Sequence, residues 1–307
     1  MRLRERAMLC LLVQLAVTCL SLSGQHLFRR RNVAAFAEQP YVFAVEVAAD
    51  TPVPLTVAPQ ATFTPQPDAA ETDTFLRVEV IRETPEPPSW AGKRVLIYHT
   101  HTWEAYEQTD GAPYRETEKW RTKDNSNNVV AVGDALTAAL EALGLTVVHD
   151  TTAFEPPNLD DAYERSLAML QRRAEAGESY DLYIDLHRDA LSSASTIRRT
   201  VTIGGEEVAR FMVLIGKGTT GGYTEKPDWE ANQLIARRIT SSLNGQCEGL
   251  ARDVKIKTGR FNQHVADRCV LIECGVNTNT LQQVLSGVPY LAQAIADALA
   301  GGESSSE

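Results

Sequence analysis

The stretch Arg94-Val-Leu-Ile-Tyr-His99-Thr-His101-Thr-Trp-Glu104 ends a short apolar run in two histidines and a carboxylate. Two later stretches have the same form: Tyr180–Asp189 ends in Asp-Leu-His-Arg-Asp, and Val270–Gly275 places a glutamate after Val-Leu-Ile. In an open α/β sheet, ligands and catalytic groups gather at the carboxyl ends of the strands. These stretches therefore predict three strands that deliver ionisable side chains to one edge of a sheet.

From Lys93 onward, strand and helix patterns alternate along the chain. Such alternation predicts an α/β fold, with a mostly parallel twisted sheet and helices on both of its faces. The stretches 196–203 and 208–215 flank Gly204-Gly205 and are expected to form an edge hairpin. The other expected strands are 95–98, 145–148, 180–186 and 270–273, and the expected helices are 128–143, 163–176, 229–243 and 289–300.

The composition disfavours some binding partners and some kinds of site. The net charge is −10 and no long basic run occurs, so nucleic acid is not an expected partner, because phosphate binding needs concentrated Lys and Arg. Cys247, Cys269 and Cys274 follow the amino-terminal region as an odd set without CxxC spacing. A disulfide framework and a cysteine zinc site are both disfavoured.

The amino terminus predicts a membrane address. Residues 1–24 contain three early arginines followed by an apolar stretch of roughly 17 residues, which indicates an uncleaved signal anchor. The basic flank predicts that the following chain is extracytoplasmic. A cleaved signal peptide and a secreted protein are the alternative. Residues 25–91 are rich in Pro and Thr and are expected to be a linker, and residues 92–302 a catalytic domain.

The residue types at the strand ends point to metal-dependent hydrolysis. Zinc hydrolases commonly use three ligands drawn from His and carboxylates, with water in the fourth position. On a regular strand, Val95, Ile97, His99 and His101 share one face. Glu273 has the character of a general base; a buried salt bridge to Arg188 or Arg268 is the structural alternative.

Several motifs together resemble the stage II sporulation protein P family. They are His99-Thr-His101, Asn128-Val-Val-Ala-Val-Gly133-Asp134, Asp185-Leu-His187-Arg188-Asp189, and Asn262-Gln263 followed by Leu271-Ile-Glu273. The resemblance covers roughly Lys93 to Ala300, with the motifs in the family's order. It implies a zinc-dependent N-acetylmuramoyl-L-alanine amidase that cleaves the bond between the muramic acid lactyl group and L-alanine of the stem peptide. An added cross-link endopeptidase activity, a role in spore engulfment and a glycan-cleaving partner enzyme are also implied.

The same resemblance implies roles for individual residues. His101 and His187 correspond to zinc ligands, and Glu273 to the catalytic glutamate. The related amidases place a ligand Glu before the first long helix, where this chain has Lys123-Asp124-Asn125. Glu104 is therefore the expected third ligand, with His99 and Asp124 as alternatives.

Further residues are assigned around this site. Arg188 is expected to steady the substrate, Asp189 to steady a ligand, Asp185 to accept a hydrogen bond from a ligand His, and Gln263 and His264 to line the groove. The alternative function is a catalytically inactive peptidoglycan-binding module of the same fold. The presence of His101, His187 and Glu273 favours the enzyme. A soluble metallopeptidase would require a cleaved signal.

Overall fold

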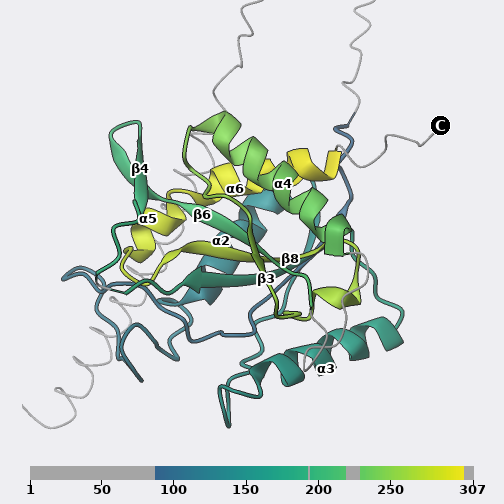
Figure 1. Ribbon diagram of the computed structural model, residues 1–307, viewed down its shortest axis with the longest axis horizontal. Helices are drawn as coiled ribbons and strands as arrows, with labels where there is room; N and C mark the ends of the chain where they lie inside the picture. The colour runs from purple at the N-terminus through teal and green to yellow at the C-terminus, as the bar shows by residue number, and fades with distance from the viewer. Residues whose placement is uncertain (1–86, 193, 219–228, 301–307) are drawn as a thin grey trace, which may run out of the picture. The chain divides into compact units, whose positions relative to one another are not determined.

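The computed structural model describes residues 87–192, 194–218 and 229–300 (Figure 1). The expected anchor at 1–24 and all but the last residues of the expected linker lie outside the described residues. Within the part that the structure describes, no helix has both the length and the apolar character needed to cross a bilayer.

The described chain alternates strands and helices. The strands are β1 Arg94–Tyr98, β2 Thr146–His149, β3 Leu182–Asp189, β4 Thr200–Ile203, β5 Glu206–Ala209, β6 Phe211–Gly216, β7 Lys255–Lys257 and β8 Cys269–Val276. The helices are α2 Val129–Ala142, α3 Ala162–Glu175, α4 Trp229–Gln246, α5 Leu281–Leu285 and α6 Val288–Ala300, with a single 3-10 turn, η1, at Gln263–Val265.

A six-stranded sheet has the order β2-β1-β3-β8-β6-β7. The pairs β1–β2, β1–β3, β3–β8 and β6–β7 are parallel, and only β6–β8 is antiparallel. The expectation of a mixed α/β fold with a mostly parallel sheet is confirmed. The three strands expected to carry the site, β1, β3 and β8, are consecutive in this sheet.

Helices cover both faces of the sheet. Val95 and Ile97 of β1 pack in a large core with α2, α4 and α6. Leu96 and Tyr98 point the other way and pack against α3 through Met169 and neighbouring residues. Figure 1 shows α3 on the opposite side of the sheet from α4 and α6. A strand that is buried on both faces needs a continuous apolar run, which is what β1 has.

Several of the expected elements differ in extent from those in the structure. β4 and β5 form a separate two-stranded sheet, while β6 continues into the main sheet with all six residues buried. The expected hairpin partner of β4 therefore stops at Ala209. Helix α4 runs three residues beyond its predicted end at Leu243. The side-chain amide oxygen of Asn244, inside this helix, accepts a hydrogen bond from the Ala251 N–H at 2.8 Å.

Candidate active site

Strands β3 and β8 bring His187 and Glu273 together. The two residues occupy paired positions on these parallel neighbours. Ile184, Leu186 and Ile272 lie in the core under α2, α4 and α6, so the alternating residues Asp185, His187 and Glu273 face the α3 side. His187 is 4% exposed and Glu273 is 8% exposed, which makes their protonation states sensitive to neighbouring charge.

His187 lies between two carboxylates. Its Nε2 is 2.8 Å from Asp185 Oδ1, and its Nδ1 is 3.3 Å from Glu104 Oε2. Burial opposes a charge on the imidazole, but Asp185 and Glu104 outweigh it and raise the pKa of His187 well above its usual value. Burial likewise opposes ionisation of Glu104, yet His187 and Arg188 lower its pKa to about 2. The position between His187 Nδ1 and Glu104 Oε2 therefore favours a positively charged group.

Hydrogen bonds from Thr100 hold the Asp185 carboxylate in place. Its Oδ1 accepts a hydrogen bond from the Thr100 N–H at 2.8 Å, and its Oδ2 accepts one from the Thr100 hydroxyl at 2.6 Å. Although burial acts against the charged form, His187 and these bonds lower the pKa of Asp185. A fully buried, ionised carboxylate thus lies at ion-pair distance from one ring nitrogen of His187.

Arg188 ties the loop of Glu104 to β3. The Arg188 N–H donates to Glu104 Oε2 at 3.1 Å. Its guanidinium donates to the carbonyl oxygens of Ala105 at 3.0 Å and Trp120 at 3.2 Å. The side chain therefore positions the loop that carries Glu104, and its expected contact with substrate stays a prediction.

His101 lies beside His187, with ring centroids 5.3 Å apart. Its Nδ1 is 3.6 Å from Glu155 Oε1 and has no hydrogen-bond partner among the described residues. Burial and the charge of His187 lower the pKa of His101 to about 4, so the ring is neutral near pH 7. A neutral imidazole with an unpartnered nitrogen has the form that a metal requires.

Sequence reasoning missed Glu155 and Arg121. Glu155 is 3% exposed and reaches the site from the loop after β2. Its Oε2 is 2.6 Å from an Arg121 guanidinium nitrogen. The available signal was a carboxylate in Phe154-Glu155-Pro156, shortly after a predicted strand that ends at this same edge of the sheet.

Glu273 lacks a partner. Its Oε2 is buried and accepts no hydrogen bond from any residue that the structure describes. Burial, with smaller contributions from Glu104 and Asp189, raises the pKa of Glu273 to about 8. The alternative of a salt bridge to Arg188 or Arg268 is not formed within these residues. Asp189, expected to steady a ligand, instead pairs with Arg252 at 2.8 Å.

His99 and His101 do not share a face, because β1 ends at Tyr98. His99 Nδ1 donates to the Leu186 carbonyl at 2.9 Å, and its Nε2 is 2.8 Å from His149 Nε2. Burial, reinforced by His149, lowers the pKa of His99 to about 3. The ring packs against Gly133 of α2, on the opposite face from His187. The expectation of a common face is wrong.

Two other assigned residues also lie elsewhere. Asp124 is exposed, and its carboxylate accepts hydrogen bonds from Ser126 and Asn127 in its own turn. Gln263 is buried; its side chain accepts from the Gly216 N–H and donates to the Leu214 carbonyl, both at 2.9 Å. Gln263 therefore anchors a loop to β6, and the expectation that it lines the groove is wrong.

The residues at this site match zinc in type. In the described part of the chain, no three His, Cys, Asp or Glu side chains are arranged as a group that could hold a metal ion. Two donors nevertheless have a ligand pair's spacing: Glu104 Oε2 and His187 Nδ1 are 3.3 Å apart. Tetrahedral zinc with bonds of roughly 2.0–2.1 Å separates its ligands by about 3.3 Å. His101 supplies a third donor of suitable type beside them.

Comparison with known proteins gives a curated relative and several solved structures. One relative, stage II sporulation protein P of Bacillus subtilis (strain 168), is 27% identical over 214 residues, which is 66% of this chain and 50% of the relative. The chain thus spans about half the length of the curated relative that it matches.

Two solved structures resemble the fold weakly, each at 14% identity. One is the CwlD amidase from Clostridioides difficile in complex with the GerS lipoprotein, with a TM-score of 0.44 over 67% of this chain and 96% of that one. The other is the N-acetylmuramoyl-L-alanine amidase AmiC2 of Nostoc punctiforme, with a TM-score of 0.41 over 68% and 96%. The fold assignment rests on the strand order given above.

The family comparison covers most of the chain. A model of one protein family, described as stage II sporulation protein P, matches residues 60–296. That range includes every strand and every ionisable residue of the site. The chain therefore belongs to the stage II sporulation protein P family.

Proposed function

We propose that this chain is a zinc-dependent peptidoglycan hydrolase, an N-acetylmuramoyl-L-alanine amidase, that remodels the cell wall during sporulation. The observation that supports this most is the arrangement around His187. One ring nitrogen is backed by the ionised Asp185, the other faces Glu104, and the unpartnered carboxyl of Glu273 lies on the next strand. Family membership supports the link to sporulation.

His101, Glu104 and His187 would hold the zinc ion in this proposal. Glu104 and His187 already have the spacing of a ligand pair, and His101 would complete the set by turning its side chain towards them. With zinc bound, Asp185 would accept a hydrogen bond from the Nε2–H of His187 and so leave Nδ1 for the metal. When bound, the ion supplies Lewis acidity to the scissile carbonyl and to the attacking water.

Glu273 would act as the proton carrier. Its carboxylate takes a proton from the attacking water as the water oxygen bonds to the carbonyl carbon, and it gives that proton to the leaving amine as the carbon–nitrogen bond breaks. The pKa of about 8 describes the carboxyl without a metal ion beside it. Added positive charge beside His187 would lower that pKa and put Glu273 in the charged form that a base needs.

The amino-terminal region would determine where in the cell the protein acts. Residues 1–24 would anchor the protein in the membrane, residues 25–91 would act as the linker, and residues 92–302 would be the extracytoplasmic catalytic domain. Peptidoglycan is the proposed substrate, with the cross-link as a second point of cleavage. A glycan-cleaving sporulation enzyme is the proposed partner.

Digestion of purified sacculi by the full chain tests the function. With zinc supplied, we expect release of free stem peptides with an amino-terminal L-alanine, and no release in the presence of a chelator. Glu273→Gln should abolish release while zinc still binds. The conservative change Asp124→Asn, in an exposed turn, is the matched control and should leave release unchanged. Binding to sacculi without any released peptide would instead identify a binding module.

A further inference from the structure

A surface hollow of about 710 Å³ lies beside the end of the sheet at β6 and β7. Lysine and aliphatic side chains, a short loop and one aromatic ring line it: Lys217, Ile256, Lys257, Thr258, Gly259 and Phe261. None of these residues has a part in the proposed hydrolysis.

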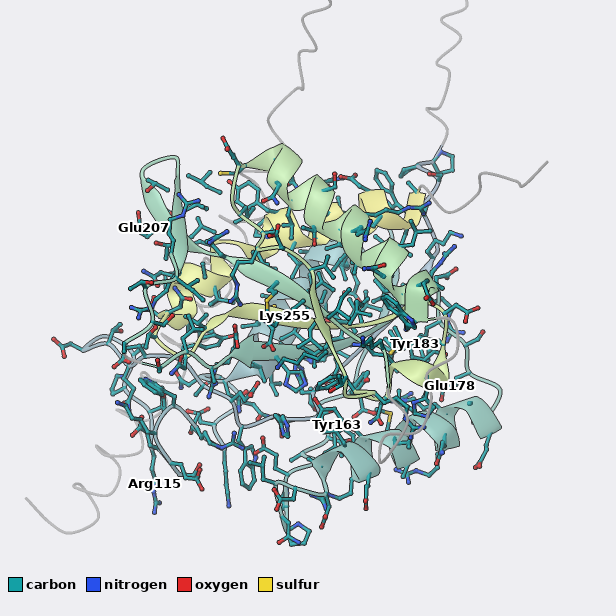
Figure 2. The ribbon with its side chains drawn as sticks, viewed as in Figure 1. Arg115, Tyr163, Glu178, Tyr183, Glu207 and Lys255 are labelled. Carbon is teal, nitrogen blue, oxygen red and sulfur yellow. The ribbon has the colours of Figure 1, made fainter. Side chains whose placement is uncertain are left out.

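Aromatic contacts connect this hollow to the proposed metal ligands. The rings of Phe261 and Tyr163 are 5.8 Å apart, and the rings of Tyr163 and His101 are 5.5 Å apart. Figure 2 labels Tyr163 at the start of α3, on the side of that helix nearest the sheet. Two consecutive ring contacts therefore connect the hollow to the proposed metal ligand His101.

The wall that carries Phe261 is held in an unusual backbone conformation. Phe261 and Asn262 are consecutive non-glycine residues with positive φ, 49° and 53°. Such conformations are energetically unfavourable and persist where surrounding contacts enforce them, often at ligand-binding sites. Asn262 Nδ2 supplies such contacts by donating to the Tyr163 carbonyl at 2.8 Å and the Ser166 hydroxyl at 3.0 Å.

Two glycines provide the space that the Phe261 ring occupies. A Cβ added to Gly216 would lie 2.2 Å from the Gly259 carbonyl and 2.8 Å from the Phe261 ring. A Cβ added to Gly259 would lie 2.7 Å from the same ring. The wall is therefore pre-formed and needs no rearrangement before a ligand enters, which reduces the entropy cost of binding.

The charge of the hollow selects its ligand. Lys217 and Lys257 are exposed, and neither forms an ion pair with any residue in the described ranges. Two lysine ammonium groups beside an aromatic ring fit a carboxylate attached to a short peptide. The positive charge of the hollow contrasts with the net charge of the whole chain, which is −10.

We propose that this hollow is a substrate subsite for a carboxylate-bearing peptide segment, with Lys217 and Lys257 binding the carboxylate and Phe261 packing against the peptide. The proposal rests on the proposed function, since the stem peptide supplies such carboxylates. It assigns specificity to residues that do not touch the reacting atoms.

Steady-state kinetics of the full chain test the subsite with two soluble probes. One is an N-acetylmuramoyl-peptide with free carboxylates, and the other is the same compound with those carboxylates amidated. Lys217→Gln combined with Lys257→Gln should raise KM for the first probe about fivefold, with kcat within twofold, because exposed ion pairs each contribute modestly. The amidated probe should not distinguish the variant from the unchanged chain.

Lys255→Gln is the matched control, because Lys255 lies on β7 but outside the hollow (labelled in Figure 2). It should leave KM for both probes unchanged. An equal rise in KM for the control, or no rise in the double variant, would overturn the subsite.

A binding measurement separates this proposal from the hydrolase itself. Full-length chain with Glu273→Gln is titrated with the carboxylate probe by calorimetry, with and without the two lysine substitutions. Weaker binding in the lysine variant supports the subsite even if the unchanged chain releases no product. Equal binding overturns the subsite even if hydrolysis is observed.

Discussion

His187 on β3 and Glu273 on β8 are directly paired across two parallel strands, and both side chains project from the face of the sheet that α3 covers. This single register places a residue with a raised imidazole pKa beside a buried carboxyl with a raised pKa. Because the strands are buried on both faces, neither side chain can move away without disturbing the core.

Glu273→Gln should change how stability depends on pH in the metal-free chain. The pKa of Glu273 rises from an ordinary 4.5 to about 8 in the fold, so between these values the unfolded chain releases a proton that the folded chain keeps. Stability is therefore lost as pH rises through this window. Relative to Glu273→Gln, the unchanged chain should lose on the order of 4 kcal/mol between pH 5 and 8.

Urea denaturation in the presence of a chelator, repeated across that range, measures this difference. Titrating groups that do not interact with Glu273 contribute equally to both proteins and cancel in the comparison. A difference in unfolding free energy that is constant from pH 5 to 8 would contradict the raised pKa.

Asp185→Asn should weaken zinc binding about 10- to 100-fold, because the neutral amide no longer stabilises a donating Nε2–H on His187. Competition with a chromophoric chelator measures the affinity. Asp181→Asn is the matched control, since Asp181 immediately precedes β3 and bonds only at that strand's start, to the Arg94 N–H and Lys93. Equal weakening in both variants would show that Asp185 has no specific role towards the metal.

The sheet was predictable because its strands are short apolar runs bounded by polar residues. The composition of the apolar runs located β1, β3 and β8. The ionisable residues were found because they directly follow those runs in the sequence. Alternation along β3 puts Asp185 and His187 on one face. It failed for His99 and His101, because β1 ends at Tyr98 and the following turn reverses the direction of later side chains.

Sequence periodicity does not predict where the side chains of loop residues lie. Glu155 lies on a loop and pairs with Arg121, and neither residue belongs to a periodic pattern that would mark it. The short strand β7 was also missed, since Lys255-Ile-Lys257 has no apolar pattern and all three residues are exposed. Such segments take their structure from the elements they contact.

Gly133→Ala should destabilise the fold by about 1–3 kcal/mol, although Ala is the better helix former. A Cβ at position 133 would lie 2.4 Å from His149 Nε2 and 2.8 Å from His99 Nε2. In a His149→Ala background most of this conflict is removed, so the same substitution should cost much less. Urea denaturation of the four proteins gives the coupling energy, and additive effects would contradict the close packing.

Glu104→Gln and Glu155→Gln decide which carboxylate is the third ligand, because both lie near the proposed metal position. Glu104 Oε2 is 3.3 Å from His187 Nδ1, as expected of two ligands, and the pKa of Glu104 is lowered to about 2. The carboxylate of Glu155 is instead engaged by Arg121 at 2.6 Å, which reduces its attraction for a cation.

Glu104→Gln should weaken zinc binding at least 100-fold, whereas Glu155→Gln should retain one zinc per chain with an affinity within about tenfold. Zinc content after dialysis, with competition titration, measures both. Loss of zinc in Glu155→Gln and retention in Glu104→Gln would exchange the two roles.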